Sequence, residues 1–239
     1  MMALPPSPLP TPPSPLVVAI DGPAGSGKST VARQLADALH WAYLDTGAMY
    51  RAVTVRALDA GIDPGDTARI VALTRAADLH LDPRTGHVSI DGHDVTDVIR
   101  TARVGGAVSS VAAVAEVRDV MVAHQRRFAQ ENGRIVAEGR DIQTVVFPEA
   151  VLKVFLDATE TVRVERRVAE MRRKDPDLDP SRVQRELADR DRMDRGRELA
   201  PLKAAPDAVH LDTTRLTPAK VLEELLRLVR SRVPPDATA

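Results

Sequence analysis

A glycine-rich stretch near the start of the sequence carries the clearest chemistry. It is Gly22-Pro23-Ala24-Gly25-Ser26-Gly27-Lys28-Ser29-Thr30, and its first eight residues match the phosphate-binding pattern G-x-x-x-x-G-K-[ST]. In such loops main-chain N–H groups converge on phosphate oxygens, the lysine adds a positive charge, and the hydroxyl after it can hold Mg²⁺. We therefore expect these nine residues to bind ATP, with Lys28 acting in catalysis and Ser29 binding the metal.

Three charged residues farther along the chain could hold a second phosphate compound. Arg190, Asp194 and Arg197 follow the spacing i, i+4, i+7, which places two guanidinium groups and a carboxylate on one face of a helix. Such a face could bind a sugar phosphate. A run of charges is more often a solvated, salt-bridged helix surface, and the spacing alone favours that interpretation.

A second candidate for metal chemistry is the segment Val154-Phe155-Leu156-Asp157, which could be the Walker B strand of an ATPase. The alternative is a buried strand whose Asp157 caps the next helix, because Glu160 follows at the spacing of a capping box. The sequence favours the second interpretation.

The elements around the glycine-rich stretch give the context that its motif requires. Residues 16–20 form an apolar run typical of a buried parallel strand. After the loop, Val31, Leu35 and Leu39 recur at i, i+4, i+8, which predicts a helix with one buried face. Strand, loop and helix therefore follow one another as in proteins that bind phosphate through this motif.

Further apolar runs predict the rest of the sheet. They lie at residues 42–44, 135–137, 151–156 and 208–211, with helical patterns between most of them. One such helix ends near Gly133, and Thr217-Pro218 opens the last helix. We expect an α/β fold of the P-loop NTPase type, with a five-stranded parallel sheet flanked by helices.

Two segments depart from this alternation of strands and helices. Residues 79–95 alternate around two turn sequences and predict a small β insertion, within a region of about 78–105. Residues 165–197 are rich in Arg, Asp and Glu, which excludes a core element and predicts a mobile lid, at about 163–190, followed by a charged helix. The domain should span residues 16–233, between a disordered proline-rich tail at 1–15 and a short tail at 234–239.

The composition excludes several classes of function. The 239 residues suit a single catalytic domain, and 33 basic against 34 acidic residues leave a net charge of -1, which favours neither nucleic acid nor an anionic membrane. There is no cysteine and hence no disulfide or thiolate metal site, and no apolar run approaches the ~20 residues of a membrane span. We expect a cytoplasmic monomer that acts on small molecules, without nucleic-acid or membrane partners.

Five blocks of sequence, in a fixed order behind the phosphate loop, carry a more specific signal. They are Asp45-Thr46-Gly47-Ala48-Met49-Tyr50-Arg51; Val108-Ser109 with Val117-Arg118; Gly139-Arg140-Asp141; Thr144-Val145-Val146-Phe147-Pro148; and Arg190-Asp191 through Pro201-Leu202. Together they resemble the bacterial cytidylate kinase family, from about Val17 to the final helix.

This resemblance implies a nucleoside monophosphate kinase with a core, an acceptor-binding region that contains the β insertion, and a lid. The reaction would transfer the γ-phosphoryl group of ATP, with Mg²⁺, to CMP or dCMP. The residues it assigns to the acceptor are Thr46, Arg51, Arg140 and Arg197 around the phosphate, Arg190 and Asp194 near the sugar, and Ser109, Arg118 and Asp141 at the base. Arg51, Arg140 and Arg197 would join Lys28 in catalysis.

The assigned base-binding residues suit cytosine chemically. Cytosine presents an amine donor beside two acceptors, which a carboxylate and one or two donors can bind, whereas uracil has an oxygen in place of the amine. The alternative is a P-loop kinase for another small acceptor, such as UMP, dTMP or a non-nucleotide. Family members usually have glycine at the position of Gln143, and if that position needs a positive φ, glutamine would shift the loop that carries Asp141.

Overall fold

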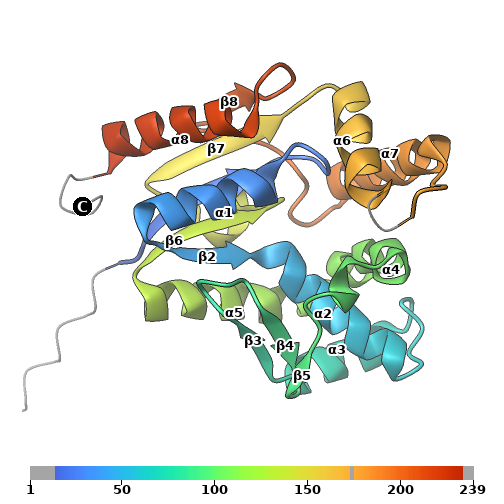
Figure 1. The fold of residues 1–239 in the computed structure, drawn as a ribbon. Coiled ribbons are helices and arrows are strands. Elements are labelled where there is room, and N and C mark those ends of the chain that lie inside the picture. Colours follow the sequence, from blue (N-terminus) through green and yellow to red (C-terminus); the bar gives the residue numbers. More distant parts are fainter. Residues whose placement is uncertain (1–13, 173–174, 234–239) are drawn as a thin grey trace, which may run out of the picture.

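The protein is built around one parallel sheet, as the sequence predicts. The structure, a computed structural model, describes residues 14–172 and 175–233, so most of the predicted N-terminal tail and all of 234–239 lie outside the described residues. The sheet has the strand order β2-β6-β1-β7-β8 (Figure 1). Its strands are β1 (Leu16–Asp21), β2 (Ala42–Asp45), β6 (Arg134–Gly139), β7 (Leu152–Asp157) and β8 (Val209–Asp212).

Helices cover both faces of this sheet (Figure 1). Those that pack on it or beside it are α1 (Lys28–Leu39), α2 (Thr46–Asp59), α3 (Thr67–Ala76), α4 (Ala102–Ala113), α5 (Ala115–Asn132) and α8 (Pro218–Arg232). Successive side chains of β1 point to opposite faces: Val18 and Ile20 pack with α1 and α8, and Val17 and Ala19 pack on the side of α2 and α5. All four are almost completely buried, so β1 is the centre of both apolar layers.

The topology brings two loops together at the carboxyl edge of the sheet. β1 pairs with β6 on one side and β7 on the other, and the last residue of β1, Asp21, lies in register with Gly139 of β6. The glycine-rich loop after β1 and the Gly139-Arg140-Asp141 loop after β6 therefore leave the sheet side by side. Crevices at this edge are where open α/β sheets bind their ligands.

The predicted β insertion is present as a separate antiparallel sheet, β3 (Leu79–Leu81), β4 (Val88–Ile90) and β5 (His93–Asp94), followed by a 3-10 turn, η1 (Val98–Arg100). Its tip is tied to the core, because the Tyr43 amide donates to the Pro83 carbonyl at 2.8 Å. Arg33 of α1 also donates to the Thr85 carbonyl at 2.5 Å, and its guanidinium lies 4.6 Å from the centre of the Tyr43 ring. The insertion thus spans from α1 to α2.

The charged segment differs from its prediction. It forms two helices, α6 (Glu160–Arg172) and α7 (Pro180–Gly196), beyond the carboxyl edge of the sheet (Figure 1). These helices share a small apolar cluster, made by Ala24, Val168, Leu178, Val183 and Leu187. The expectation that this segment contains no core element is therefore wrong, because Val168 of α6 and Val183 and Leu187 of α7 are enough, with Leu178 between them and Ala24 of the glycine-rich loop, to join two charged helices.

The helix ends agree with their sequence signals, except at Asp157. Gly133 ends α5 with φ 71°, and the Thr217 side chain accepts from the Lys220 amide at the start of α8. Asp157 binds the amide of the next residue, Ala158, at 2.8 Å, and α6 begins only at Glu160, so Asp157 does not occupy the helix-cap position. No helix among the described residues is long and apolar enough to span a membrane.

Candidate functional site

The glycine-rich loop occupies the turn from β1 into α1, and its glycines are required by geometry. A Cβ atom on Gly22 would lie 2.0 Å from the Leu156 carbonyl oxygen, and Gly27 has φ 93°. Lys28, the first residue of α1, is buried, and its Nζ donates to the Pro23 carbonyl at 2.7 Å. Burial, reinforced by the charge of Arg140, lowers the pKa of Lys28 to about 7.

The hydroxyl that follows the lysine binds a carboxylate that the sequence reasoning did not single out. Ser29 donates to Glu138 Oε1 at 2.6 Å, and the hydroxyl of Tyr43 donates to the same oxygen at 3.2 Å. Burial raises the pKa of Glu138, and the charge of Asp45 raises it further. Glu138 is the last residue but one of β6, next to Gly139-Arg140-Asp141, and its distance from Ser29 along the chain hid its role. Thr30 is exposed on α1.

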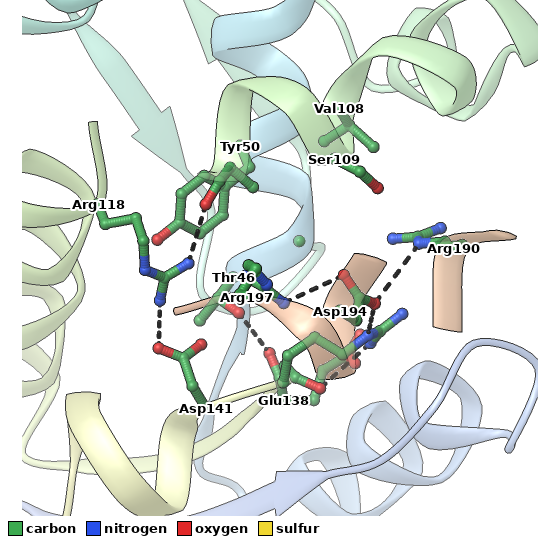
Figure 2. A pocket seen from close by; sticks show the side chains of 14 residues that line it. Thr46, Tyr50, Val108, Ser109, Arg118, Glu138, Asp141, Arg190, Asp194 and Arg197 are labelled. Atoms are coloured by element: carbon green, nitrogen blue, oxygen red, sulfur yellow. Dashed lines mark hydrogen bonds and ion pairs between the residues drawn. The ribbon is translucent and has the colours of Figure 1, made fainter. Parts of the chain in front are cut away.

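A cavity lies beside this carboxylate, between α2, α4, the β6 loop and α7 (Figure 2). It is lined by Thr46, Gly47, Tyr50, Val108, Ser109, Ala112, Arg118, Glu138, Gly139, Arg140, Asp141, Arg190, Asp194 and Arg197. Eight of the nine residues predicted to bind the acceptor are in this set, and the ninth, Arg51, is not. Residues from five separate elements of the chain therefore converge as the sequence predicts.

A buried ion pair forms one end of the cavity. Arg118 of α5 and Asp141 face each other (Figure 2), and each side chain is less than a tenth exposed. Arg118 also donates to the Ala112 carbonyl at 3.2 Å, and its guanidinium lies 5.6 Å from the centre of the Tyr50 ring. Ser109 of α4 lies at the same cavity, half-buried. This end thus offers a carboxylate, a guanidinium, a hydroxyl and an aromatic ring.

The other end has more positive than negative charge. The Asp194 carboxylate accepts from Arg140 Nε at 2.7 Å and from Arg197 Nη2 at 3.1 Å, with Arg190 Nε at 3.9 Å. Burial alone would raise the pKa of Asp194, but these three arginines hold it below its usual value. One carboxylate therefore balances three guanidinium groups.

Two hydrogen-bond donors at this end of the cavity have no acceptor among the described residues. Nε of Arg190 and Nε of Arg197 are buried and have no hydrogen-bond partner among the described residues. Burial, together with the charges of Arg140 and Arg51, lowers the pKa of Arg190 to about 9. Buried donors without acceptors are costly, so this end of the cavity suits an anion that can accept from them.

Arg51 lies behind this cluster. It is buried, its Nη1 donates to the Ile99 carbonyl of η1 at 2.9 Å, and it is not among the residues that line the cavity. Burial and the neighbouring Arg100 lower the pKa of Arg51 to about 10. Arg100 in turn binds Asp45 at 2.6 Å, and Asp45 caps α2 through the Ala48 amide. Arg51 therefore adds to the positive potential without direct contact in this conformation.

Three arginines of α6, Arg163, Arg166 and Arg167, lie where the sequence predicts the lid, and their environments differ. Arg163 is buried and bonds the Asp191 carboxylate at 2.6 Å and the Ala24 carbonyl at 3.0 Å. Arg166 bonds Thr213 at 2.7 and 3.0 Å. Arg167 pairs with Glu170 near the surface, and its charge contributes to the lowered pKa values of Arg51 and Arg190. Of the three, Arg167 is the one whose charge is among the main causes of the lowered pKa values of Arg51 and Arg190.

Gln143 does not have the conformation considered from the sequence. It belongs to a π-helical turn, η2 (Ile142–Val146), and is not among the described non-glycine residues with positive φ. Its side chain is 1% exposed, and its amide nitrogen donates to the Val154 carbonyl at 2.8 Å. The position therefore does not need a positive φ, so the condition under which glutamine would shift the loop is not met, and the glutamine fits inside the protein.

The cavity is small for a nucleotide. Its volume is about 60 Å³, whereas small-molecule sites usually measure about 300–1,000 Å³. A more open hollow of about 310 Å³ adjoins it between α4 and α7 and shares Ser109, Asp194 and Arg197.

Comparison with known proteins agrees with this geometry. The family model described as cytidylate kinase matches residues 18–231. The chain belongs to the cytidylate kinase family. Three relatives are cytidylate kinases from Solibacter usitatus (49% identical over 220 residues, 91% of this chain and 94% of the relative), Geobacillus kaustophilus (46% over 218 residues, 90% and 97%) and Nocardia farcinica (46% over 222 residues, 92% and 96%).

Membership of the cytidylate kinase family confirms the resemblance seen in the sequence and, with it, the class of enzyme, a kinase. It also supports phosphorylation of CMP or dCMP with ATP over the alternative acceptors. The P-loop α/β fold is confirmed by the five-stranded parallel sheet itself.

Proposed function

We propose that this protein transfers the γ-phosphoryl group of ATP to CMP or dCMP, and that the cavity beside the glycine-rich loop holds the acceptor. One observation carries this assignment: Arg190 and Arg197 each keep a buried Nε donor without a partner among the described residues. Lys28 lies close enough for Arg140 and Arg190 to act on its pKa. Basic side chains thus lie on both sides of one space, which suits the binding of a donor and an acceptor phosphate.

The donor is held by the glycine-rich loop. Its main-chain N–H groups and the amino end of α1 favour the phosphates of ATP, and Lys28 adds a charge. An anion beside Lys28 favours its protonated form and reverses the lowering of its pKa. Arg167 of α6 is the lid residue that we assign to the phosphoryl group in transfer, because its charge already acts on Arg51 and Arg190.

Mg²⁺ fits the donor set beside the loop. The Ser29 hydroxyl and Glu138 Oε1 lie 2.6 Å apart, and hard oxygen ligands of this kind are those Mg²⁺ uses. Glu138 is buried, and burial and the charge of Asp45 raise its pKa, so its charged form is disfavoured in the folded protein. A cation beside it would stabilise that charged form. When bound, the metal neutralises charge on the phosphates. We assign Ser29 and Glu138 to hold it, directly or through its water ligands.

The base is assigned to the Arg118–Asp141 end of the cavity. Asp141 can accept from the exocyclic amine of cytosine, while Arg118 and Ser109 can donate to its ring nitrogen and carbonyl oxygen. Uracil would place an oxygen against the carboxylate. The expected preference for CMP over UMP is worth about 1–3 kcal/mol, the value of a good bidentate base contact.

Transfer itself needs position and charge neutralisation more than a reactive side chain. An oxygen of the acceptor phosphate forms the new bond to the γ-phosphorus, and the bond from that phosphorus to the β–γ bridging oxygen breaks, which gives CDP or dCDP and ADP. Arg140, Arg190 and Arg197 hold the acceptor phosphate and sugar, and Thr46 lies at the same wall. Arg51 can join them once it leaves the Ile99 carbonyl.

A panel of acceptors tests the proposal. Release of ADP from ATP and Mg²⁺ should depend on added monophosphate and should be fastest with CMP or dCMP, slower with UMP and slowest with dTMP. ADP release that ignores the monophosphate, or that favours UMP, would overturn it. The monomeric state, the cytoplasmic location and the absence of nucleic-acid partners stay predictions.

A further inference from the structure

The loop that carries Asp141 accepts support from a carboxylate at the end of β1, the strand that leads into the glycine-rich loop. Asp21 is completely buried at the end of β1, directly before Gly22. One of its carboxylate oxygens accepts from the Ile142 amide at 3.1 Å, and the other accepts from the Gln143 amide at 2.9 Å. The turn that follows Asp141 is therefore fixed to the strand that begins the phosphate loop.

The side chain of Gln143 then extends this attachment in two directions. Its Nε2 donates to the Val154 carbonyl of β7 at 2.8 Å, and its Oε1 accepts from the Ala205 amide at 3.2 Å. Ala205 belongs to the segment that returns from α7, and the Leu202 amide of that segment donates to the Asp194 carbonyl at 2.8 Å. A single buried amide group thus joins the loop of Asp141, the sheet and the segment behind Asp194.

Only a side chain with a donor and an acceptor at this length can make both bonds. Methionine has neither group in useful strength, and asparagine carries both on a side chain one carbon shorter. The two partners are main-chain groups, which are costly to leave buried without a hydrogen bond.

We propose that Gln143 is a positioning residue for base recognition: it sets the distance of Asp141 from the arginines and carboxylate of α7, and so helps the site discriminate cytosine from uracil. This inference rests on the proposed assignment of Asp141 to the base. Errors of about 1 Å in such placements can lower rates by about 100-fold. Gln143 itself does not line the cavity, so it acts through the two loops that it joins.

The test compares Gln143→Met with a control that loses a buried hydrogen bond elsewhere. Thr74 of α3 is 1% exposed, and its hydroxyl donates to the Ile70 carbonyl at 2.7 Å, so Thr74→Val is the matched change. For both variants, melting temperature, kcat and KM are measured with CMP, with UMP and with varied ATP. Gln143→Asn, which can reach only one of the two partners, is made as well and serves alone if Gln143→Met does not fold.

We expect Gln143→Met to lower the ratio of kcat/KM for CMP over UMP by about tenfold and to raise KM for CMP, with KM for ATP changed less than about twofold. Thr74→Val should lower the melting temperature and leave the ratio and both KM values unchanged. A Gln143 variant that is less stable but keeps the ratio and the KM for CMP would overturn the inference.

Asp141→Asn distinguishes a wrong positioning role for Gln143 from a wrong assignment of the base to Asp141. If Asp141→Asn lowers the ratio and the Gln143 variants do not, the base site is right and the positioning role of Gln143 is wrong. If Asp141→Asn also leaves the ratio unchanged, the assignment of the base to Asp141 is wrong, and the role of Gln143 is overturned with it.

Discussion

Arg190 offers the sharpest test of the site, because the structure predicts that it weakens the fold. Burial and the charges of Arg140 and Arg51 lower its pKa from the usual value of arginine to about 9. Arginine stays protonated at any working pH, so this shift measures an energetic cost of the charged side chain in the folded state, and not a titration. Replacement of Arg190 by methionine should therefore stabilise the protein when no nucleotide is bound.

The size of the effect follows from the same numbers. Each pKa unit corresponds to about 1.4 kcal/mol, so the cost is at most about 5 kcal/mol. A quarter of the side chain is exposed, which screens part of the repulsion, and Asp194 at 3.9 Å returns some attraction. A net gain of about 2 kcal/mol is a reasonable expectation, and for a domain of this size it raises the melting temperature by about 4–8 °C.

Function should change in the opposite direction. Arg190→Met removes a buried donor from the acceptor end, and a charged hydrogen bond of this kind is worth about 1.5–3 kcal/mol, so kcat/KM for CMP should fall by about 10- to 100-fold. Thermal melting with and without CMP measures both effects, because CMP should stabilise the original protein more than the variant. The control is Arg185→Met on the same helix, since that side chain is 70% exposed.

A lower melting temperature for Arg190→Met without nucleotide would refute this reasoning. It would mean that the guanidinium has adequate partners in the folded protein. Unchanged kinetics with CMP would refute the assignment of Arg190 to the acceptor. Any clear change in Arg185→Met would show that the charge of α7 as a whole, and not the buried site, controls stability.

Four further predictions concern the rest of the site. Lys28→Ala should lower kcat by about 100-fold or more while the melting temperature is kept, since a preorganised charge is lost from the phosphate site; near-normal turnover would contradict its role. Asp141→Asn should reduce the ratio of kcat/KM for CMP over UMP by about 5- to 150-fold, the range that about 1–3 kcal/mol allows, and an unchanged ratio would count against the base assignment. Glu138→Gln should raise the Mg²⁺ concentration for half-maximal rate by about tenfold, and Glu149→Gln is the control because Glu149 is exposed. The same dependence of rate on Mg²⁺ in Glu138→Gln as in the original protein would argue against a metal role for Glu138. Burial lowers the pKa of Lys28 to about 7, so above pH 7 its amine is mainly neutral in the free enzyme and ATP binding should take up a proton. KM for ATP should therefore rise from pH 7 to 9. Calorimetry in two buffers that shows no proton uptake at pH 8 would contradict this.

The features that the sequence predicts well are local ones. The loop from Gly22 to Ser29, the strand before it and the helix after it are consecutive, so their spacing contains the information. The β insertion at 79–95 is likewise marked by its own turns and alternation. Arg190 and Asp194 lie on α7 as their spacing predicts, whereas Arg197 is the first residue after the end of that helix, and all three line the cavity.

The features that the sequence misses depend on contacts between distant segments. Glu138 meets Ser29 only because β6 pairs with β1, and no spacing within 134–139 reveals that neighbour. Arg51 was expected at the acceptor phosphate, but the Ile99 carbonyl of the insertion holds its guanidinium. Which arginine of α6 acts on the acceptor site, Arg163 or Arg167, depends on how α6 is rotated against the phosphate loop. The spacing of residues within 163–167 does not reveal that rotation.

The contacts of Arg163 have a consequence for how the enzyme can vary. This side chain bonds the Ala24 carbonyl of the phosphate loop and the Asp191 carboxylate beside the acceptor arginines. A displacement of either partner changes the geometry of one of these two bonds, and any coupling of binding free energies through them would have the same size in both directions. A substitution at Arg163 removes both bonds together, so the support of the phosphate loop and that of Asp191 are not altered separately at this position.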